Sequence, residues 1–94
     1  MVQGRWLRMS ALRQPDEKPV RLGVVTSRRV GAAVQRNRVR RRLREIFRAC
    51  RAQISDGLWL VVTAKTGAAD AGFAELREEW LRLAGRLSIF RTLP

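Results

Sequence analysis

The segment 36–45, which reads RNRVRRRLRE, holds six arginines within ten residues. A guanidinium group stays charged and binds phosphate through two parallel hydrogen bonds. Arginines four residues apart on a helix repel one another by ~0.2–0.5 kcal/mol per pair, whereas burying one large apolar side chain stabilises a fold by roughly 1.5–3 kcal/mol. The apolar residues of the segment can therefore hold a helix together against this repulsion. The pattern predicts a helical face that binds a polyanion.

The helix that presents these arginines is expected from about residue 32 to residue 53. At 100° per residue its apolar side chains share one arc, which should face the core: Val39, Leu43, Ile46, Phe47, Cys50 and Ile54. The opposite side carries Arg40, Arg41, Arg44, Arg48 and Arg51. The segment 28–51 contains ten arginines and one acidic residue, Glu45. Because a solvated helix face usually mixes both signs of charge, this face favours a bound polyanion over simple solvation.

The whole chain repeats this charge imbalance. Its 94 residues carry 20 lysines and arginines against 8 acidic residues, a formal net charge of +12. That balance indicates nucleic acid as the partner before a membrane surface. The length suits one domain, and no apolar run approaches the roughly 20 residues of a membrane span. Since the first twelve residues also lack a signal-peptide core, a cytoplasmic protein is expected.

Few residues in this sequence are of the types that carry out catalysis. There is no histidine for general acid–base catalysis, and the single cysteine, Cys50, excludes both an internal disulfide and a Cys/His zinc cluster. A two-metal nuclease centre needs convergent carboxylates, which the spacing does not supply. Glu75 and Glu79 share one helix face, but we interpret them as a solvated surface. The sequence therefore assigns no catalytic residue and no metal ligand.

Three strands and a second helix should position the arginine helix. The strands are expected at residues 5–12, 20–26 and 58–64, a turn at 14–19, and the last helix at 73–87 with Asp70 as its N-cap. Gly23 inside the second strand suggests a bulge or a close backbone approach. The run LWLVVTA at 58–64 is typical of a strand buried on both faces.

This order of elements favours an α+β fold, in which a small central sheet of three to four strands is packed by helices. The strands before and after the arginine helix could be parallel neighbours. A crossover between such strands is right-handed by default.

The segment 21–48, RLGVVTSRRVGAAVQRNRVRRRLREIFR, resembles the protein subunit of bacterial ribonuclease P. The positions that match the family at its fixed spacing are Arg21, Leu22, Gly23, Ser27, Arg28, Arg29, Val30, Gly31, Ala33, Val34, Arg36, Asn37, Arg38, Arg40, Arg41, Arg44, Glu45, Phe47 and Arg48. The strand within DGLWLVVTAK and the last helix also look like the family, so the resemblance covers about residues 4–87.

The resemblance implies a single RNA-binding domain over residues 1–94 that is an accessory subunit, not a catalyst. In this family a large catalytic RNA uses Mg2+ to hydrolyse a phosphodiester of precursor tRNA and release the 5′ leader. The implied partners are that catalytic RNA and the precursor-tRNA leader, with no membrane and no small-molecule substrate. The protein alone is expected to bind no cofactor.

The resemblance also implies a particular fold. The family has a left-handed β-α-β crossover around the arginine helix, which overrides the right-handed default. Its members usually begin with a short helix, which is missing here because Gly4-Arg5-Trp6 already resembles the start of the first strand. We expect two strands to be compressed into residues 1–12, and either a natural start upstream or weakened leader binding.

Residue roles follow from the same resemblance together with side-chain chemistry. The RNA-binding residues are expected to be Arg28, Arg29, Arg36, Asn37, Arg38, Arg40, Arg41, Arg44 and Arg48. The family's cleft for the single-stranded leader calls for an aromatic platform, for which Trp6 is the candidate. The other large aromatic residues are expected in the core, namely Phe47, Trp59, Phe73 and Trp80.

Two other interpretations of the basic helix remain. A structural RNA-binding protein of ribosomal type would have a similar composition, and the RNR pattern at 36–38 is what argues against it. A sequence-specific DNA binder usually mixes Asn, Gln and Ser with Arg on its reading face, whereas this face is nearly all arginine. An enzyme in its own right is the least favoured interpretation.

Overall fold

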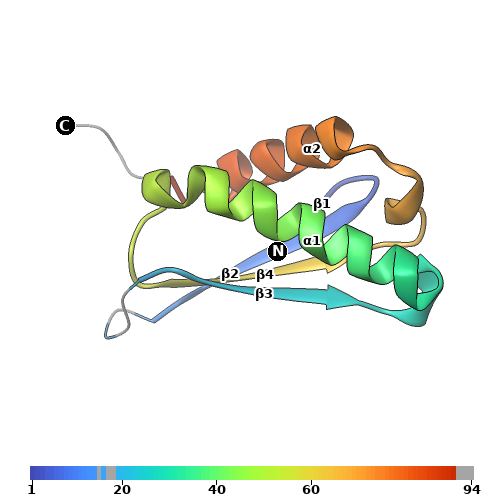
Figure 1. The fold of residues 1–94 in the computed structure, drawn as a ribbon. Helices are drawn as coiled ribbons and strands as arrows, with labels where there is room; N and C mark the ends of the chain where they lie inside the picture. The colour runs from blue at the N-terminus through green and yellow to red at the C-terminus, as the bar shows by residue number, and fades with distance from the viewer. Residues whose placement is uncertain (15, 17–18, 91–94) are drawn as a thin grey trace.

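The computed structural model describes residues 1–14, 16 and 19–90. Its strands are β1 (Val2–Gln3), β2 (Leu7–Arg13), β3 (Arg21–Thr26) and β4 (Leu58–Ala64), and its helices are α1 (Ala33–Cys50) and α2 (Phe73–Arg86). Short 3-10 turns lie at Arg28–Val30, Arg51–Gln53 and Ala68–Asp70. Both helices lie on the same side of one sheet (Figure 1). The expected α+β class is confirmed, while part of the turn expected at 14–19 falls outside the described residues.

The sheet has the strand order β1-β2-β4-β3. β4 pairs antiparallel with β2 and parallel with β3, so the strands on either side of α1 are neighbours as expected. Seen from the helix side with β3 and β4 pointing up, β4 lies to the left of β3 (Figure 1). The crossover through α1 is therefore left-handed, against the general preference for the right-handed form.

The core fills the space between the sheet and the two helices. The sheet contributes the buried residues Leu7, Met9, Leu60 and Val62, α1 contributes Val39, Leu43 and Ile46, and α2 contributes Leu76, Trp80 and Leu83. The three residues of α1 belong to the predicted apolar arc. Of the other two arc residues within the helix, Phe47 is half-buried and Cys50 is buried. Packing of this arc is what offsets the repulsion among the arginines.

Three local expectations were wrong. β2 begins at Leu7 instead of residue 5, although the two strands expected near residues 1–12 are present as β1 and β2. α2 has Gly72 as its N-cap in place of Asp70, and the Glu75 carboxylate accepts a hydrogen bond from the Gly72 backbone N–H at 3.0 Å. α1 ends at Cys50, three residues early, because the chain tightens into a 3-10 turn there.

The strand β4 was also expected to be buried on both faces, and this is wrong. Leu60, Val62 and Ala64 point into the core, whereas Trp59 is 39% exposed and Val61 and Thr63 are half-buried. The reason is that both helices cover one face of the sheet, so the other face is left open in the described structure (Figure 1). A strand with apolar residues on both faces does not reveal which face is covered.

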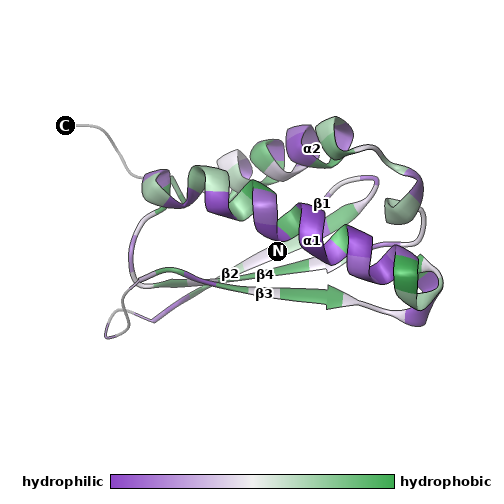
Figure 2. Ribbon diagram, viewed as in Figure 1, coloured by the Kyte–Doolittle hydropathy of each residue, from purple (hydrophilic) through white to green (hydrophobic). Residues whose placement is uncertain are grey.

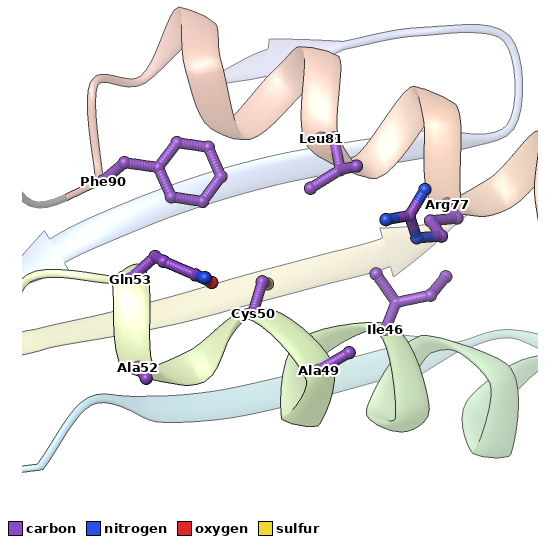
Figure 3. Close-up of a pocket in the computed structure, with 8 residues that line it drawn as sticks. All are labelled: Ile46, Ala49, Cys50, Ala52, Gln53, Arg77, Leu81 and Phe90. Carbon is purple, nitrogen blue, oxygen red and sulfur yellow. The ribbon is translucent and has the colours of Figure 1, made fainter.

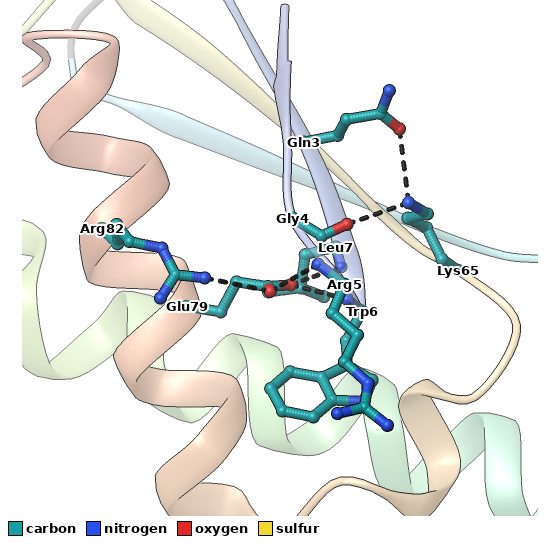
Figure 4. A network of polar contacts seen from close by, with 8 residues as sticks. All are labelled: Gln3, Gly4, Arg5, Trp6, Leu7, Lys65, Glu79 and Arg82. Atoms are coloured by element: carbon teal, nitrogen blue, oxygen red, sulfur yellow. Dashed lines mark hydrogen bonds and ion pairs between the residues drawn. The ribbon is translucent and has the colours of Figure 1, made fainter.

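Glu79 overturns the expectation of a solvated acidic face on α2. Its side chain is 1% exposed and accepts hydrogen bonds from three consecutive backbone N–H groups, those of Arg5, Trp6 and Leu7, at 2.7–2.8 Å (Figure 4). Arg82 donates a further bond to the same carboxylate at 3.3 Å. These contacts tie the turn between β1 and β2 to α2.

Candidate nucleic-acid interface

The outer face of α1 gathers the charged side chains that the sequence singled out. Hydrophilic residues follow one side of this helix along its length (Figure 2). Six of them line one shallow hollow: Asn37, Arg40, Arg41, Arg44, Glu45 and Arg48. The helical spacing places the side chains at positions 37, 40, 41, 44 and 48 above one another. The structure thus brings five of the nine predicted RNA-binding residues together.

The four arginines of this hollow have no acidic partner among the described residues. The side chains of Arg40, Arg41 and Arg44 make no hydrogen bond or ion pair with the described part of the chain, and the same holds for Arg48. Glu45 likewise pairs with none of its described neighbours. These arginines are spaced regularly by the helix, and their guanidinium groups have no described partner within the chain. Such a row of free donors suits the phosphates of a nucleic-acid backbone.

The start of α1 is set by a glycine and a glutamine. Gly31 adopts φ +147°, and a Cβ at this position would collide with the Gln35 side chain. That space lets the Gln35 side-chain oxygen accept a hydrogen bond from the Ala32 backbone N–H at 2.8 Å, which replaces the capping that alanine cannot supply. The arrangement fixes the first turn, from which Arg36 and Asn37 project.

Arg28 and Arg29 lie in the 3-10 turn that joins β3 to α1, and both are exposed. The Ser27 hydroxyl accepts a hydrogen bond from the Arg29 backbone N–H at 3.3 Å and so orders this turn. Arg29 also lines a second hollow, at the edge where β2 and β4 meet the turn, together with Arg8 and Lys65. The basic surface therefore continues from α1 toward the sheet.

Not every arginine of α1 points to solvent. Arg38 is half-buried, and its Nε atom is buried without a partner in the described structure. Arg42 donates a hydrogen bond from Nη1 to the Ala71 carbonyl at 3.0 Å, which links α1 to the segment before α2. Arg42 thus has a structural contact, whereas the arginines of the outer hollow have none within the described chain.

Trp6, the expected aromatic of the leader cleft, lies in the turn before β2. The guanidinium carbon of Arg5 is 5.2 Å from the centroid of the Trp6 ring. The backbone N–H of Trp6 donates one of the hydrogen bonds to Glu79 (Figure 4). The ring is half-buried against the core and shares a hollow with Glu75 and Glu78 of α2. Its role in leader binding stays a prediction.

The aromatic residue on the open face of the sheet is Trp59, which the sequence pattern placed in the core. That expectation was wrong for Trp59 and for Phe73, which are both 39% exposed, and correct for Trp80, which is fully buried. The signal that could have found Trp59 is its alternation with Leu60: on a strand one of two successive side chains must point away from the core.

A separate apolar pocket of about 490 Å3 opens between the end of α1 and α2 (Figure 3). Ile46, Leu81 and Phe90 line it together with Arg77, and Cys50 lies at its wall. Burial raises the pKa of the Cys50 thiol, and this effect outweighs the opposing influence of the Arg77 charge. The thiol is therefore held in its weakly nucleophilic, protonated form.

The side chains most often found as metal ligands are scattered over the described residues. They bring no three His, Cys, Asp or Glu side chains together. Nor do they include a helix long and apolar enough to cross a membrane. What the described surface does offer is an array of arginines whose spacing is set by α1.

Comparisons with known proteins agree with this arrangement. A sequence model of the family described as Ribonuclease P matches residues 1–88. The ribonuclease P protein component of Acidothermus cellulolyticus is 44% identical over 88 residues, which cover 93% of this chain and 73% of that protein. The corresponding protein of Symbiobacterium thermophilum is 42% identical over 79 residues, which cover 81% of this chain and 69% of that protein.

Solved structures show the same fold. The ribonuclease P protein of Staphylococcus aureus superposes with a TM-score of 0.87 at 23% identity, covering 96% of this chain and 82% of that one. The protein of Thermotoga maritima gives a TM-score of 0.80 at 29% identity, covering 90% and 80%. Together with the arginine-lined α1 and the left-handed crossover, these matches show that the chain belongs to the family of ribonuclease P protein components.

Proposed function

We propose that the outer face of α1 is the surface through which this ribonuclease P subunit binds the catalytic RNA. A protein component of ribonuclease P is by definition the partner of that enzyme's RNA, and what the proposal adds is the set of contacts. The observation that carries it is the hollow lined by Arg40, Arg41, Arg44 and Arg48, none of which has a described acidic partner. Asn37 lines the same hollow, and we include Arg28, Arg29, Arg36 and the half-buried Arg38 as its extension at the start of the helix.

The proposal also includes the 5′ leader of precursor tRNA as a second ligand, bound on the open face of the sheet. Support comes from the continuity of basic residues: the hollow with Arg8, Arg29 and Lys65 lies between the start of α1 and the open face. A strand of RNA anchored at α1 can pass through this hollow onto the sheet. In this arrangement the protein holds both the RNA subunit and its substrate.

Catalysis is assigned to the RNA. The described part of the chain brings no set of carboxylates together that would hold Mg2+, so the proposal leaves the metal ions with the RNA subunit. The protein contributes positive charge that lowers the repulsion between two polyanions, and it orients the leader. The cytoplasmic location expected from the sequence is part of this proposal, since precursor tRNA is the substrate.

Reconstitution tests the proposal directly. Adding the protein to its catalytic RNA at low Mg2+ should accelerate cleavage of precursor tRNA, and no acceleration would contradict the proposed function. The double variant Arg40→Ala with Arg44→Ala should weaken binding to the catalytic RNA. It should also lower the slope of log affinity against log salt by about 0.7–0.9 for each phosphate that is no longer neutralised.

A matched control is available on α2. The double variant Arg77→Ala with Arg86→Ala removes the same charge from two exposed residues outside the α1 hollow. If the control weakens binding as much as the α1 variant, net charge alone explains the affinity and the assigned face is wrong. Thermal melts of both variants show whether folding is intact.

A further inference from the structure

Trp59 lies across its neighbouring strand on the open face of the sheet. It is 39% exposed and projects from β4, where its register partner on β3 is Arg21. Gly23 lies two residues after Arg21 on β3, and a Cβ at this position would be 3.4 Å from the indole Nε1 of Trp59. The edge of the indole that carries Nε1 therefore lies next to Gly23, while the residue remains 39% exposed to solvent.

Gly23 leaves the space beside the indole open. Glycine in a strand interior destabilises a fold relative to alanine, because it loses more conformational freedom on folding. The register of β3 on β4 is continuous through Gly23, so no bulge explains the glycine. A side chain larger than alanine at this position would occupy the space next to the indole.

The surroundings of Trp59 suit a single-stranded nucleic acid. None of the four described strands contains an acidic residue, while β2 and β3 contribute Arg8 and Arg21. Leu12, the register partner of Trp59 on β2, is 51% exposed, and Val25 on β3 is 48% exposed. An exposed apolar surface with a flat aromatic ring and basic residues around it offers stacking for bases together with charge for phosphates.

We propose that Trp59 is a base-stacking platform that binds one nucleobase of the precursor-tRNA leader. This rests on the proposed function, in which the leader crosses the open face. A second copy of the chain is the other occupant that an exposed sheet face could accept, but a net charge of +12 on each copy opposes self-association. Single-stranded RNA supplies bases that stack on the ring and phosphates that neutralise the positive charge.

The location of Trp59 specifies which part of the leader it contacts. The hollow next to α1 includes Thr63, four residues along β4 from Trp59, which is a separation of about 13 Å along the strand. On the proposed path of the leader from α1 onto the sheet, the nucleotide stacked on Trp59 therefore lies about 13 Å beyond those held in the hollow. A leader too short to reach across the sheet should gain nothing from Trp59.

The test uses the reconstituted holoenzyme and precursor tRNAs whose leaders differ in length. Trp59→Ala should weaken affinity for long-leader substrates roughly 5- to 150-fold, the range for loss of one base–aromatic stack. Affinity for short-leader substrates and for mature tRNA should not change. Trp59→Phe should retain most of the affinity, and Phe73→Ala, which removes an equally exposed ring from α2, should have no effect.

Abasic nucleotides identify the stacked base. One abasic position in a long leader should weaken wild-type binding but leave binding by the Trp59→Ala variant unchanged, because the two changes remove the same interaction. A separate route is Gly23→Val, whose added methyl groups would displace the indole and reproduce the loss seen with Trp59→Ala. Gly23→Ala, whose Cβ would make an ordinary contact with the ring, should bind almost normally.

The outcomes separate this inference from the function on which it rests. If Trp59→Ala binds all leaders as the wild type does, while longer leaders still improve wild-type affinity, the leader crosses the protein elsewhere and the platform is wrong. If leader length has no effect on the wild type, the proposed leader site itself fails. A dimer that Trp59→Ala converts to monomer, with leader affinity unchanged, would assign the face to self-association and overturn the inference.

Discussion

The Glu79 side chain accepts a hydrogen bond from the backbone N–H of Leu7 at 2.7 Å, across 72 residues of sequence. The same carboxylate binds the N–H groups of Arg5 and Trp6. At Gly4 a Cβ would collide with it, so glycine allows the close approach of the turn. A single side chain of α2 thereby holds the turn that leads into β2.

Replacing Glu79 should destabilise the fold more than replacing any other acidic residue of α2. Glu79→Ala leaves three backbone N–H groups without their acceptor, and we expect a loss of about 2–5 kcal/mol in the free energy of unfolding. Glu79→Gln keeps one acceptor oxygen and should lose less. Chemical denaturation measures both.

Two variants serve as controls for Glu79. Glu78→Gln changes an exposed neighbour that makes none of these contacts and should leave stability within about 0.5 kcal/mol. Arg82→Ala removes a partner that is 57% exposed, and surface pairs of this kind contribute about 0–1 kcal/mol. Equal denaturation midpoints for Glu79→Gln and Glu78→Gln would show that the buried contacts of Glu79 add nothing to the free energy of unfolding.

Gly31→Ala should loosen the start of α1. The added Cβ would collide with the Gln35 side chain at a positive φ, so both backbone strain and loss of the cap are expected, at about 1–3 kcal/mol. Affinity for the catalytic RNA should fall too, because Arg36 and Asn37 lie in the affected turn. Circular dichroism melts and RNA titrations are the measurements.

Gly67→Ala is the matched control for Gly31→Ala. Gly67 also has a positive φ, of 96°, but a Cβ there would meet nothing within 4 Å. This variant should show the strain without the loss of the cap, and RNA affinity should be unchanged. Equal RNA affinities for the two variants would contradict the role given to Gln35.

Arg41→Ala and Arg42→Ala should separate RNA binding from stability. Arg42 donates to the Ala71 carbonyl, and its loss should lower the free energy of unfolding by about 1–2 kcal/mol. Arg41 is exposed and lines the outer hollow, so its loss should weaken RNA binding and leave the melt unchanged or slightly higher, since repulsion is relieved. Identical behaviour of the two variants in both assays would refute this division.

Cys50 should react slowly with thiol reagents in the folded protein. Burial raises the pKa of the thiol, so the thiolate forms only at higher pH than in an unfolded chain. Alkylation by iodoacetamide near pH 8 should therefore be much slower in native buffer than in denaturant, and the native rate should rise as the pH is increased. A native rate equal to the denatured one would show that Cys50 is accessible and that the pocket does not shield it.

The arginine helix was predictable because its determinants are local. A helical period of 3.6 residues sorts Val39 and Leu43 to one side and Arg40 and Arg44 to the other without reference to the rest of the chain. The fixed spacing from Arg21 to Arg48 carries the family resemblance in the same way. The binding face could be described from the sequence because helix geometry alone constructs it.

Other features depended on contacts between distant segments. The sequence could not show that α1 and α2 cover the same face of the sheet, so the exposure of Trp59 was missed in a strand that is apolar on both faces. Nor could it show that the Glu79 carboxylate meets the N–H groups that precede β2.

By itself, therefore, the sequence determined the family, the order of the main elements and the basic face of α1. Tertiary structure alone decided which aromatic residue lies on the open sheet and which acidic residue is buried. The physical reason is that a period along one element specifies only which side chains share a side. What that side meets depends on packing against elements far away in the chain, as Glu79 and Leu7 illustrate.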